Sequence, residues 1–148
     1  MIHEFQGEYR WLSNMVLVDI ELKDKIYPSV EHAYMSEKSN DNNWKKLCSQ
    51  KNISGKQIKT YSKTIELRED WEDVKLLVME YCLIKKFNQE PFKTKLIETG
   101  NQNIQEGNRW SDQFWGVDLK SNPNKGENHL GRLIMKIRDK LQKNEKKK

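Results

Sequence analysis

The stretch from Glu69 to Phe87 constrains the fold of this chain more than any other part of the sequence. Apolar side chains recur in it at three- and four-residue spacing, which is the repeat of one face of an α-helix. The members of this stripe are Trp71, Val74, Leu77, Val78, Tyr81 and Ile84, and Leu76, Met79, Leu83 and Phe87 widen it. Because other elements must cover a face this wide, we expect this helix to lie in the core of a globular domain.

The composition provides a modest core around that helix. The chain has 148 residues, of which 35% are hydrophobic and 33% charged, with five Trp, five Tyr and four Phe. This length suits a single domain, and the aromatic residues bring enough apolar area to argue against intrinsic disorder. The apolar runs are far shorter than the roughly 20 residues of a membrane span, and the N-terminus lacks the basic and apolar regions of a signal peptide. We therefore expect a soluble protein that is not exported and has no membrane partner.

Charge is unevenly distributed along the chain. Its 27 Lys and Arg against 22 Asp and Glu give a formal net charge of +5. Residues 143–148 contain four Lys and one Glu, a net of +3, which leaves +2 for residues 1–142. We expect residues 1–142 to form the domain and residues 143–148 to be a disordered Lys-rich tail. A domain that binds nucleic acid needs charge clustered on the fold itself, so a solvated Lys-rich surface is the favoured interpretation.

Periodicity also predicts the elements around the long helix. Alternating apolar residues from Val16 to Leu22, followed by a turn and a return through Ile26-Tyr27, indicate a β-hairpin with one buried face. Ser29 is expected to cap a helix that ends near Ser39. Further helices are expected at about 44–50, 55–63 and 90–99, and from Asn128 onward. The fold class is therefore α+β, predominantly helical, in a single compact domain with a small N-terminal hairpin or sheet.

The two cysteines do not suggest a site. Cys48 and Cys82 form no Cys-x-x-Cys motif and no Cys/His cluster, so neither a structural zinc site nor a disulfide framework is supported. Reduced thiols in a cytoplasmic protein are the expectation.

Glu31 and Lys38 are the first pair of residues suited to chemistry. At about 100° per residue, positions 31 and 38 of one helix project from the same face, about 10.5 Å apart along the axis. They cannot form a direct ion pair, but both can reach a ligand that lies across the exposed face, and Glu31 lies in the first turn, where the helix dipole favours a carboxylate. The alternative is a helix-terminal charge at Glu31 and a solvated amine at Lys38. His32 is more typical of a hydrogen-bonded structural residue.

The segment 106–116 has the composition of a site for a polar planar ligand. It contains Glu106, Asp112, Trp110, Trp115 and Gly116. Trp provides a stacking surface, Gly allows close approach of the backbone, and carboxylates act on protons or ribose hydroxyls. The alternative is a loop whose Trp side chains only cover the core.

The start of the last predicted helix, from Gly126 to Gly131, is the third candidate. Free backbone N–H groups and the positive end of the helix dipole are suited to a phosphate. Asn128 as a plain N-cap is the alternative. The segment is not a G-x-G-x-x-G motif within a βαβ unit, so a dinucleotide-binding Rossmann fold is excluded.

Taken in order along the chain, these pieces resemble the NADAR family of YbiA-like N-glycosidases, from Phe5 to about Leu141. The matching segments are Leu12-Ser13-Asn14, Tyr27-Pro28-Ser29-Val30-Glu31-His32 with Lys38, Leu67-Arg68-Glu69-Asp70-Trp71-Glu72, Glu106 with Asp112-Gln113-Phe114-Trp115-Gly116, and Gly126-Glu127-Asn128-His129-Leu130-Gly131-Arg132-Leu133-Ile134-Met135. Two departures, the insertion Arg109-Trp110-Ser111 and a longer stretch from Val117 to Lys125, bear on the substrate more than on the reaction.

The resemblance implies a compact, mostly helical domain that hydrolyses the bond between ribose C1′ and a base nitrogen. The implied substrates are phosphoribosylamino-pyrimidine intermediates of riboflavin synthesis, or ADP-ribose attached to guanine as a nucleotide or in modified nucleic acid. The implied catalytic residues are Glu31, Lys38 and Asp112, and no metal or other cofactor is implied. The implied substrate-binding residues are Asn14, His32, Arg68, Trp71, Glu106, Trp115, Gly116, Gly126, Asn128 and Gly131.

Two mechanisms fit these residues. Carboxylates at Glu31 and Asp112 can stabilise the positive charge that builds on C1′, and one of them can activate water. Alternatively, the Lys38 amine attacks an opened ribose and forms a Schiff base that water resolves. A different class of function, a module that binds NAD or ADP-ribose without turnover, needs neither a carboxylate nor a lysine near C1′. The presence of both residue types favours an enzyme.

Overall fold

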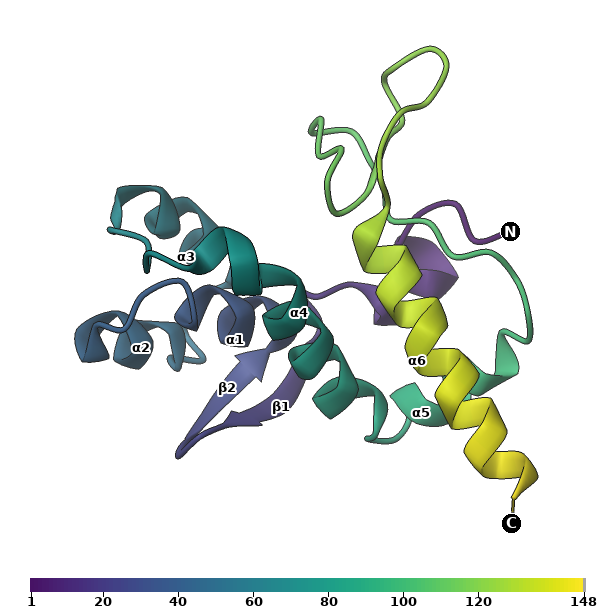
Figure 1. Cartoon of the computed structure of the whole chain (residues 1–148), viewed down its shortest axis with the longest axis horizontal. Coiled ribbons are helices and arrows are strands. Elements are labelled where there is room, and N and C mark those ends of the chain that lie inside the picture. The colour runs from purple at the N-terminus through teal and green to yellow at the C-terminus, as the bar shows by residue number, and fades with distance from the viewer. Residues whose placement is uncertain (148) are drawn as a thin grey trace. The chain divides into compact units, whose positions relative to one another are not determined.

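The computed structural model describes residues 1–147, and these form two compact units. One unit is the continuous segment Asn14–Lys86, and the other joins Met1–Ser13 to the chain from Phe87 onward. Helices dominate both units, and residues 17–29, early in the chain, form a two-stranded antiparallel sheet (Figure 1). The prediction of a predominantly helical α+β fold with a small N-terminal sheet is therefore confirmed. Among residues 1–147, the structure has no helix that is both long and apolar enough to cross a membrane.

The Asn14–Lys86 unit begins with the predicted hairpin, β1 (Leu17–Leu22) and β2 (Lys25–Ser29). The strands are antiparallel, with Ile20 opposite Tyr27, and both side chains are buried. Alternation along β1 places Ile20 and Leu22 inside and the acidic residues Asp19 and Glu21 outside, as the sequence pattern predicts.

Helix α1 (Val30–Ser36) follows the hairpin directly and is the centre of this unit. It packs against both strands, against α2 (Asn42–Cys48) and against α3 (Gly55–Tyr61). The predicted cap is present, because the Ser29 hydroxyl accepts a hydrogen bond from the His32 N–H at 3.1 Å. The helix ends at Ser36, earlier than predicted, and residues 37 and 38 form a turn.

A short 3-10 helix, η2 (Ser62–Thr64), and an extended segment lead to the long helix α4 (Trp71–Phe87). The helix is present as predicted, but the centre of its apolar stripe is not in the core. Leu77 is 67% exposed and Tyr81 is 51% exposed, whereas the buried face includes Trp71, Met79 and Leu83. Apolar residues surround much of this helix, and the short elements of the unit cover only one side of it. Periodicity alone therefore located the helix correctly, but it predicted a buried face that was too wide and centred on the wrong residues.

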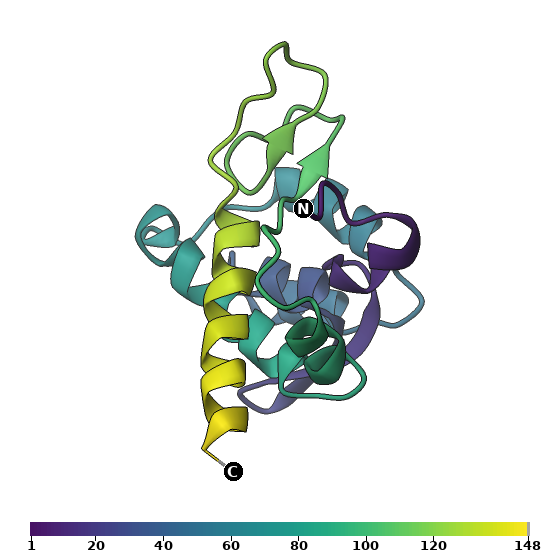
Figure 2. The ribbon, with the colours of Figure 1, turned by 90° about the vertical axis from the view of Figure 1, so that its right-hand side faces the viewer.

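The other unit contains a 3-10 helix, η1 (Gly7–Leu12), then α5 (Phe92–Glu98), two short parallel strands, β3 (Gly107–Asn108) and β4 (Val117–Asp118), and the C-terminal helix α6 (His129–Lys146). Figure 2 shows the segments that carry β3 and β4 beyond the N-terminal end of α6. The helix is present as predicted, and its buried face includes Leu130, Ile134, Ile137 and Leu141.

The predicted disordered tail is wrong for the residues that the structure describes. Helix α6 continues through Lys146, and residue 148 lies outside the described part of the chain. The Lys143 ammonium pairs with Asp139 at 3.1 Å one turn earlier, and the Gln142 amide donates to the Gly100 carbonyl at 2.7 Å. Lys, Gln and Glu are also good helix formers, so a polar sequence here extends the helix without adding to the core.

Candidate active site

The first turn of α1 holds Glu31 in a buried position. Its backbone N–H donates to the Asn14 carbonyl at 3.0 Å, which ties the start of the helix to the segment before β1. The Glu31 side chain is only 6% exposed, so the predicted solvent-facing carboxylate is a buried one. Close packing accounts for this: the Cβ and Cγ atoms of Glu31 lie 3.2 and 3.3 Å from the place a Cβ would take on Gly55.

Asn14 brings an unused hydrogen-bond acceptor to the same region. Its amide nitrogen makes a weak 3.6 Å contact with the sulfur of Met79. The amide oxygen, Oδ1, is buried and accepts no hydrogen bond from any of residues 1–147. Leaving a buried acceptor unpaired costs about 1–3 kcal/mol, so such atoms are expected where a ligand or water completes the bond. Asn14 therefore offers an acceptor next to the segment that holds Glu31.

Lys38 does not lie on the helix with Glu31, because α1 ends at Ser36. The predicted geometry of two helical turns between them is therefore wrong. In the turn, the Lys38 N–H donates to the Met35 carbonyl at 3.1 Å, and the Lys38 carbonyl accepts from the Arg68 N–H at 2.8 Å. The ammonium lies 5.8 Å from the centroid of the Tyr34 ring.

The electrostatic surroundings of Lys38 still couple it to Glu31. Burial lowers the pKa of the Lys38 amine, the nearby Glu31 carboxylate opposes that shift, and the charges of Lys59 and Lys75 add to it. A lowered pKa increases the fraction of neutral amine at a given pH, and a neutral amine is the nucleophilic form. The Asn14–Lys86 unit thus contains both the buried Glu31 carboxylate and the half-buried Lys38 amine, whose pKa is lowered.

His32 has both ring nitrogens engaged in short hydrogen bonds. Nδ1 lies 2.6 Å from the Ser29 hydroxyl, and Nε2 lies 2.6 Å from the Ile53 carbonyl. A carbonyl can only accept, so Nε2 carries a proton, and in the neutral ring Nδ1 then accepts from the Ser29 hydroxyl. Burial lowers the pKa of His32, in keeping with that neutral form. This geometry favours the structural interpretation of His32 over substrate binding.

The position of Trp71 agrees with the predicted apolar stripe of α4. It is buried, and its ring packs against Tyr34 with the centroids 5.1 Å apart and the planes inclined at 56°. Tyr34 lies next to both Trp71 and the Lys38 ammonium, so Trp71 contacts the site through Tyr34 and does not present an open surface on which a base could stack.

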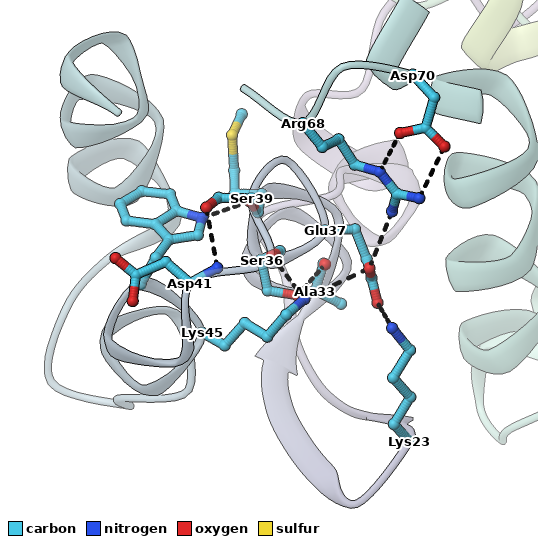
Figure 3. A network of polar contacts seen from close by, with 11 residues as sticks. Lys23, Ala33, Ser36, Glu37, Ser39, Asp41, Lys45, Arg68 and Asp70 are labelled. Atoms are coloured by element: carbon cyan, nitrogen blue, oxygen red, sulfur yellow. Dashed lines mark hydrogen bonds and ion pairs between the residues drawn. The ribbon is translucent and has the colours of Figure 1, made fainter. Parts of the chain in front are cut away.

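Sequence reasoning missed the network around Glu37. This carboxylate is 8% exposed, and Figure 3 shows it between Lys23 on one side and Lys45 and Arg68 on the other. The Lys23 and Lys45 ammonium groups lie 3.5 Å from its oxygens, and the Arg68 guanidinium lies 3.6 Å away. Arg68 also donates through two nitrogens to the Asp70 carboxylate. Arg68, predicted to bind substrate, is thus held by two carboxylates of its own unit.

A pocket of about 320 Å³ borders the same network. Its walls are Leu22, Lys23, Glu37, Leu77, Val78, Tyr81 and Cys82. It is lined in part by the α4 residues Leu77 and Tyr81, and by none of the residues predicted for the site.

In the other unit, Asn108 organises the loop that contains Asp112. Its buried amide donates to the Glu106 carboxylate at 3.0 Å and to the Asp112 carbonyl at 2.9 Å, and it accepts from the Asp112 N–H at 3.0 Å. The Asp112 oxygen Oδ1 accepts from the N–H groups of Phe114 and Trp115, at 3.1 and 2.9 Å. One oxygen of the predicted catalytic Asp112 therefore closes a turn. Asn108 gave no signal in the sequence, because its partners other than the Glu106 carboxylate are backbone groups.

The start of α6 does not offer the predicted anion site. The N–H groups of His129 and Leu130 donate to the Phe114 and Trp115 carbonyls at 3.1 and 2.9 Å, so the loop already occupies them. Asn128 stands at the N-cap position with a left-handed backbone, but its side chain does not cap the helix.

The Asn128 amide instead joins α6 to the preceding strand segment. It accepts from the Glu106 N–H at 3.0 Å and donates to the Ile104 carbonyl at 2.9 Å. The glycines here serve close approach: a Cβ on Gly116 would collide with the Glu106 carboxylate, and one on Gly131 with the Ile104 carbonyl. A Cβ on Gly126 would likewise collide with the Gly116 carbonyl. These predicted binding residues thus build the loop and the helix start.

The predicted site residues accordingly form two groups, one in each unit. The Asn14–Lys86 unit carries Asn14, Glu31, His32, Lys38, Arg68 and Trp71, and the other unit carries Glu106, Asp112, Trp115, Gly116, Gly126, Asn128 and Gly131.

Comparison with known proteins identifies the family. The model of the NADAR domain matches residues 2–142, nearly the extent predicted for the folded domain. The chain belongs to the NADAR family. Its relatives include N-glycosidase YbiA of Escherichia coli, 29% identical over 138 residues, which cover 90% of this chain and 82% of that protein. Another is a riboflavin biosynthesis protein of Vibrio vulnificus, 27% identical over 142 residues, and there the match covers 95% of this chain but only 38% of the relative.

A solved structure supports the same assignment for this NADAR chain. The NMR structure of E. coli YbiA matches it with a TM-score of 0.83 and 25% sequence identity, covering 99% of this chain and 86% of that one. The family predicted from the sequence is therefore confirmed. The prediction of an enzyme that hydrolyses N-glycosyl bonds is confirmed at the level of the family, whose curated relatives are named N-glycosidases.

Proposed function

We propose that this NADAR chain hydrolyses the bond between ribose C1′ and a base nitrogen, with Glu31 and Lys38 at the reacting centre. The observation that carries the proposal is the buried Glu31 carboxylate coupled to the perturbed amine of Lys38. Perturbed ionisable groups with a specific charged partner are typical of functional sites. The names of the relatives support the reaction type, N-glycoside hydrolysis.

The substrate class in this proposal is a phosphoribosyl- or ADP-ribosyl-base. It is either a phosphoribosylamino-pyrimidine of riboflavin synthesis or ADP-ribosylated guanine, as a nucleotide or in nucleic acid. The riboflavin name of the Vibrio relative supports the first, although the chain spans 38% of that protein. The unpaired Oδ1 of Asn14 is suited to accept from a ribose hydroxyl or an exocyclic amine of either.

Lys38 gives the reaction a covalent route. The neutral amine adds to C1′ of an opened glycosylamine, the base leaves with its nitrogen protonated, and a protonated imine joins C1′ to Nζ. Water then adds to this imine, and the resulting adduct breaks down to release the ribose aldehyde and restore the amine. In this route Glu31 takes and returns the protons in both steps, and the interaction of its carboxylate with the Lys38 charge supports this role.

The competing route has no covalent step. Glu31 removes a proton from water as the water attacks C1′, and the carboxylate stabilises the positive charge that develops on the sugar. Sodium borohydride separates the two routes, because it reduces an imine to a stable adduct on Lys38. In the covalent route Lys38→Arg is as inactive as Lys38→Ala, since guanidinium is a poor nucleophile at neutral pH. An active Lys38→Arg variant with no adduct assigns the reaction to the carboxylate.

The experiment that tests the function uses two substrates in parallel. The pure protein is incubated with a phosphoribosylamino-pyrimidine and with an ADP-ribosylated guanine oligonucleotide, and the products are resolved by mass. Release of a free base or free guanine from one of them is expected, and Glu31→Gln is the matched inactive control. Tight binding of ADP-ribose without release from either substrate would instead identify a non-catalytic NAD/ADP-ribose-binding module.

Asp112 is the proposed second carboxylate, and the substitution Asp112→Asn tests its charge separately from its turn. The amide keeps the oxygen that accepts from Phe114 and Trp115, so the loop is retained. A fall in kcat of at least tenfold is expected if the charge takes part in the reaction. Unchanged kcat would limit Asp112 to the structural role seen in its hydrogen bonds.

A further inference from the structure

We infer that Glu37 is a positioning residue for Lys38 and that it acts through Arg68. The inference rests on the proposed function in assigning Lys38 to the reacting centre, but the contacts that carry it are independent of that reaction. They form a closed loop of interactions between the end of α1 and the segment before α4.

The backbone of Lys38 needs support from outside the helix because α1 ends before it. Lys38 lies beyond the last helical residue, so the regular hydrogen bonds of a helix do not fix its backbone. It is held by a turn bond to Met35 on one side and by the N–H of Arg68, which donates to its carbonyl at 2.8 Å, on the other. The placement of the Lys38 amine therefore depends on the placement of the Arg68 backbone.

The Arg68 side chain closes the loop. Its guanidinium pairs with Glu37, the residue immediately before Lys38, at 3.6 Å, and also binds Asp70 through two nitrogens. The segment at Arg68 thus holds the turn at two consecutive positions, once by backbone and once by side chain. A guanidinium fork suits this task because its donors are fixed in one plane and can serve two carboxylates together.

Burial gives the Glu37 contact its strength. The side chains of Glu37, Lys45 and Arg68 are 10%, 12% and 22% exposed, so solvent screens their interactions only weakly. Lys45 also donates to the Ser36 carbonyl at 3.1 Å, which adds a further hold on the end of α1. Lys23, in contrast, is 71% exposed, and surface pairs of this kind contribute little.

This arrangement changes the role of Arg68. A residue that binds substrate through its guanidinium needs donors directed toward the ligand, whereas this guanidinium is engaged with Glu37 and Asp70. Figure 3 shows it between the two carboxylates. The structure favours Arg68 as the connection between α1 and α4, with the amine of Lys38 as the group that this connection places.

The test compares Glu37→Gln with Lys23→Ala, which removes an exposed partner of the same carboxylate. Glu37→Gln keeps the shape of the side chain and removes its charge. We expect kcat to fall about tenfold and KM to change less than about twofold, because a small displacement of a reacting group lowers the rate and not the affinity. Lys23→Ala is expected to retain full kcat. In an Arg68→Ala background the further effect of Glu37→Gln on kcat is expected to be smaller than in the wild-type background, since both substitutions remove the contact between Glu37 and Arg68.

Hydrogen exchange of the Arg68 amide gives a readout that does not require turnover. The N–H bonded to the Lys38 carbonyl is expected to exchange at least tenfold faster in Glu37→Gln than in the wild type and Lys23→Ala. The Ile58 amide, bonded to Ser54 in the same unit, is the reference for general loosening and is expected to keep its rate.

The possible results separate this inference from the proposed function. Unchanged Arg68 exchange in Glu37→Gln, or equal acceleration at Arg68 and Ile58, overturns the positioning role whatever the activity. Faster local exchange with unchanged kcat in an active enzyme also overturns it. A wild-type protein that releases no base refutes the proposed function, while the exchange measurement still decides whether Glu37 holds Lys38 in place.

Discussion

Gly55 is the position where a single added methyl group tests the packing of Glu31. A Cβ built on Gly55 would lie 2.6 Å from the Met15 sulfur, 3.2 Å from the Glu31 Cβ and 3.3 Å from its Cγ, whereas ordinary contacts begin at 3.4 Å. The Met15 side chain is flexible and can move aside. Glu31 belongs to the rigid first turn of α1, so its carboxylate must shift by a few tenths of an ångström in Gly55→Ala.

The expected size of the effect follows from that shift. Overpacking costs about 1–3 kcal/mol, and replacing a glycine at a helical position returns about 0.5–1 kcal/mol. The free energy of unfolding is therefore expected to fall by at most about 2.5 kcal/mol. Since a misplacement of about 1 Å can cost 100-fold in rate, a few tenths of an ångström are expected to lower kcat about five- to tenfold.

The assay pairs steady-state kinetics with urea unfolding of Gly55→Ala and Gly100→Ala. Gly100 has φ +68° with open space where a Cβ would stand, so its substitution strains the backbone and touches no neighbour. That strain costs about 1–2 kcal/mol, which matches the stability loss without moving Glu31. Full activity in Gly55→Ala, or an equal loss of kcat in Gly100→Ala, would refute the reasoning about Glu31.

Two further predictions concern buried ionisable groups. Burial lowers the pKa of His32 below 6.5, so the unfolded chain takes up the proton first as the pH falls. The contribution of His32 to the free energy of unfolding is therefore expected to be complete above about pH 6.5. Below that pH it is expected to decrease by up to about 1.4 kcal/mol per pH unit. Urea unfolding between pH 7.5 and 5.5 measures this slope, and an equal slope in His32→Gln would contradict the assignment. Burial also raises the pKa of Cys48 and Cys82 to about 12, so both thiols are expected to resist a thiol reagent at pH 8 until urea unfolds the chain. Rapid labelling of the folded protein would show that one of them is accessible.

Local signals in the sequence were sufficient for the elements. The alternation along β1 and the cap at Ser29 each depend on residues close together in the chain, and the structure confirms both. The buried side of α4 could not be predicted this way. Leu77 and Tyr81 have the right spacing for a core stripe, but their exposure depends on which side of the helix the other elements cover.

The candidate site also combines features that local sequence signals predict with contacts between distant residues that they do not predict. Glu31 and Lys38 were singled out by their spacing and again by the family resemblance, but the helical geometry assigned to them was wrong because α1 ends before Lys38. The Glu37 network depends on partners from the hairpin, α2 and the segment before α4, so no local pattern reveals it. The start of α6 fits an anion site by sequence, yet the preceding loop supplies carbonyls to its N–H groups.

The measurement that tests the central claim most directly is the rate of base release by Glu31→Gln on the substrate that the wild type cleaves. The amide preserves the size of the buried side chain and the Asn14 contact of its backbone, so the fold is expected to be retained, with an unchanged far-ultraviolet circular dichroism spectrum and urea midpoint. Removal of a group that transfers protons in the transition state is expected to lower kcat by more than about 100-fold. A folded Glu31→Gln protein that releases base at a rate near the wild-type value would contradict the account and leave Glu31 as a buried helix-terminal charge.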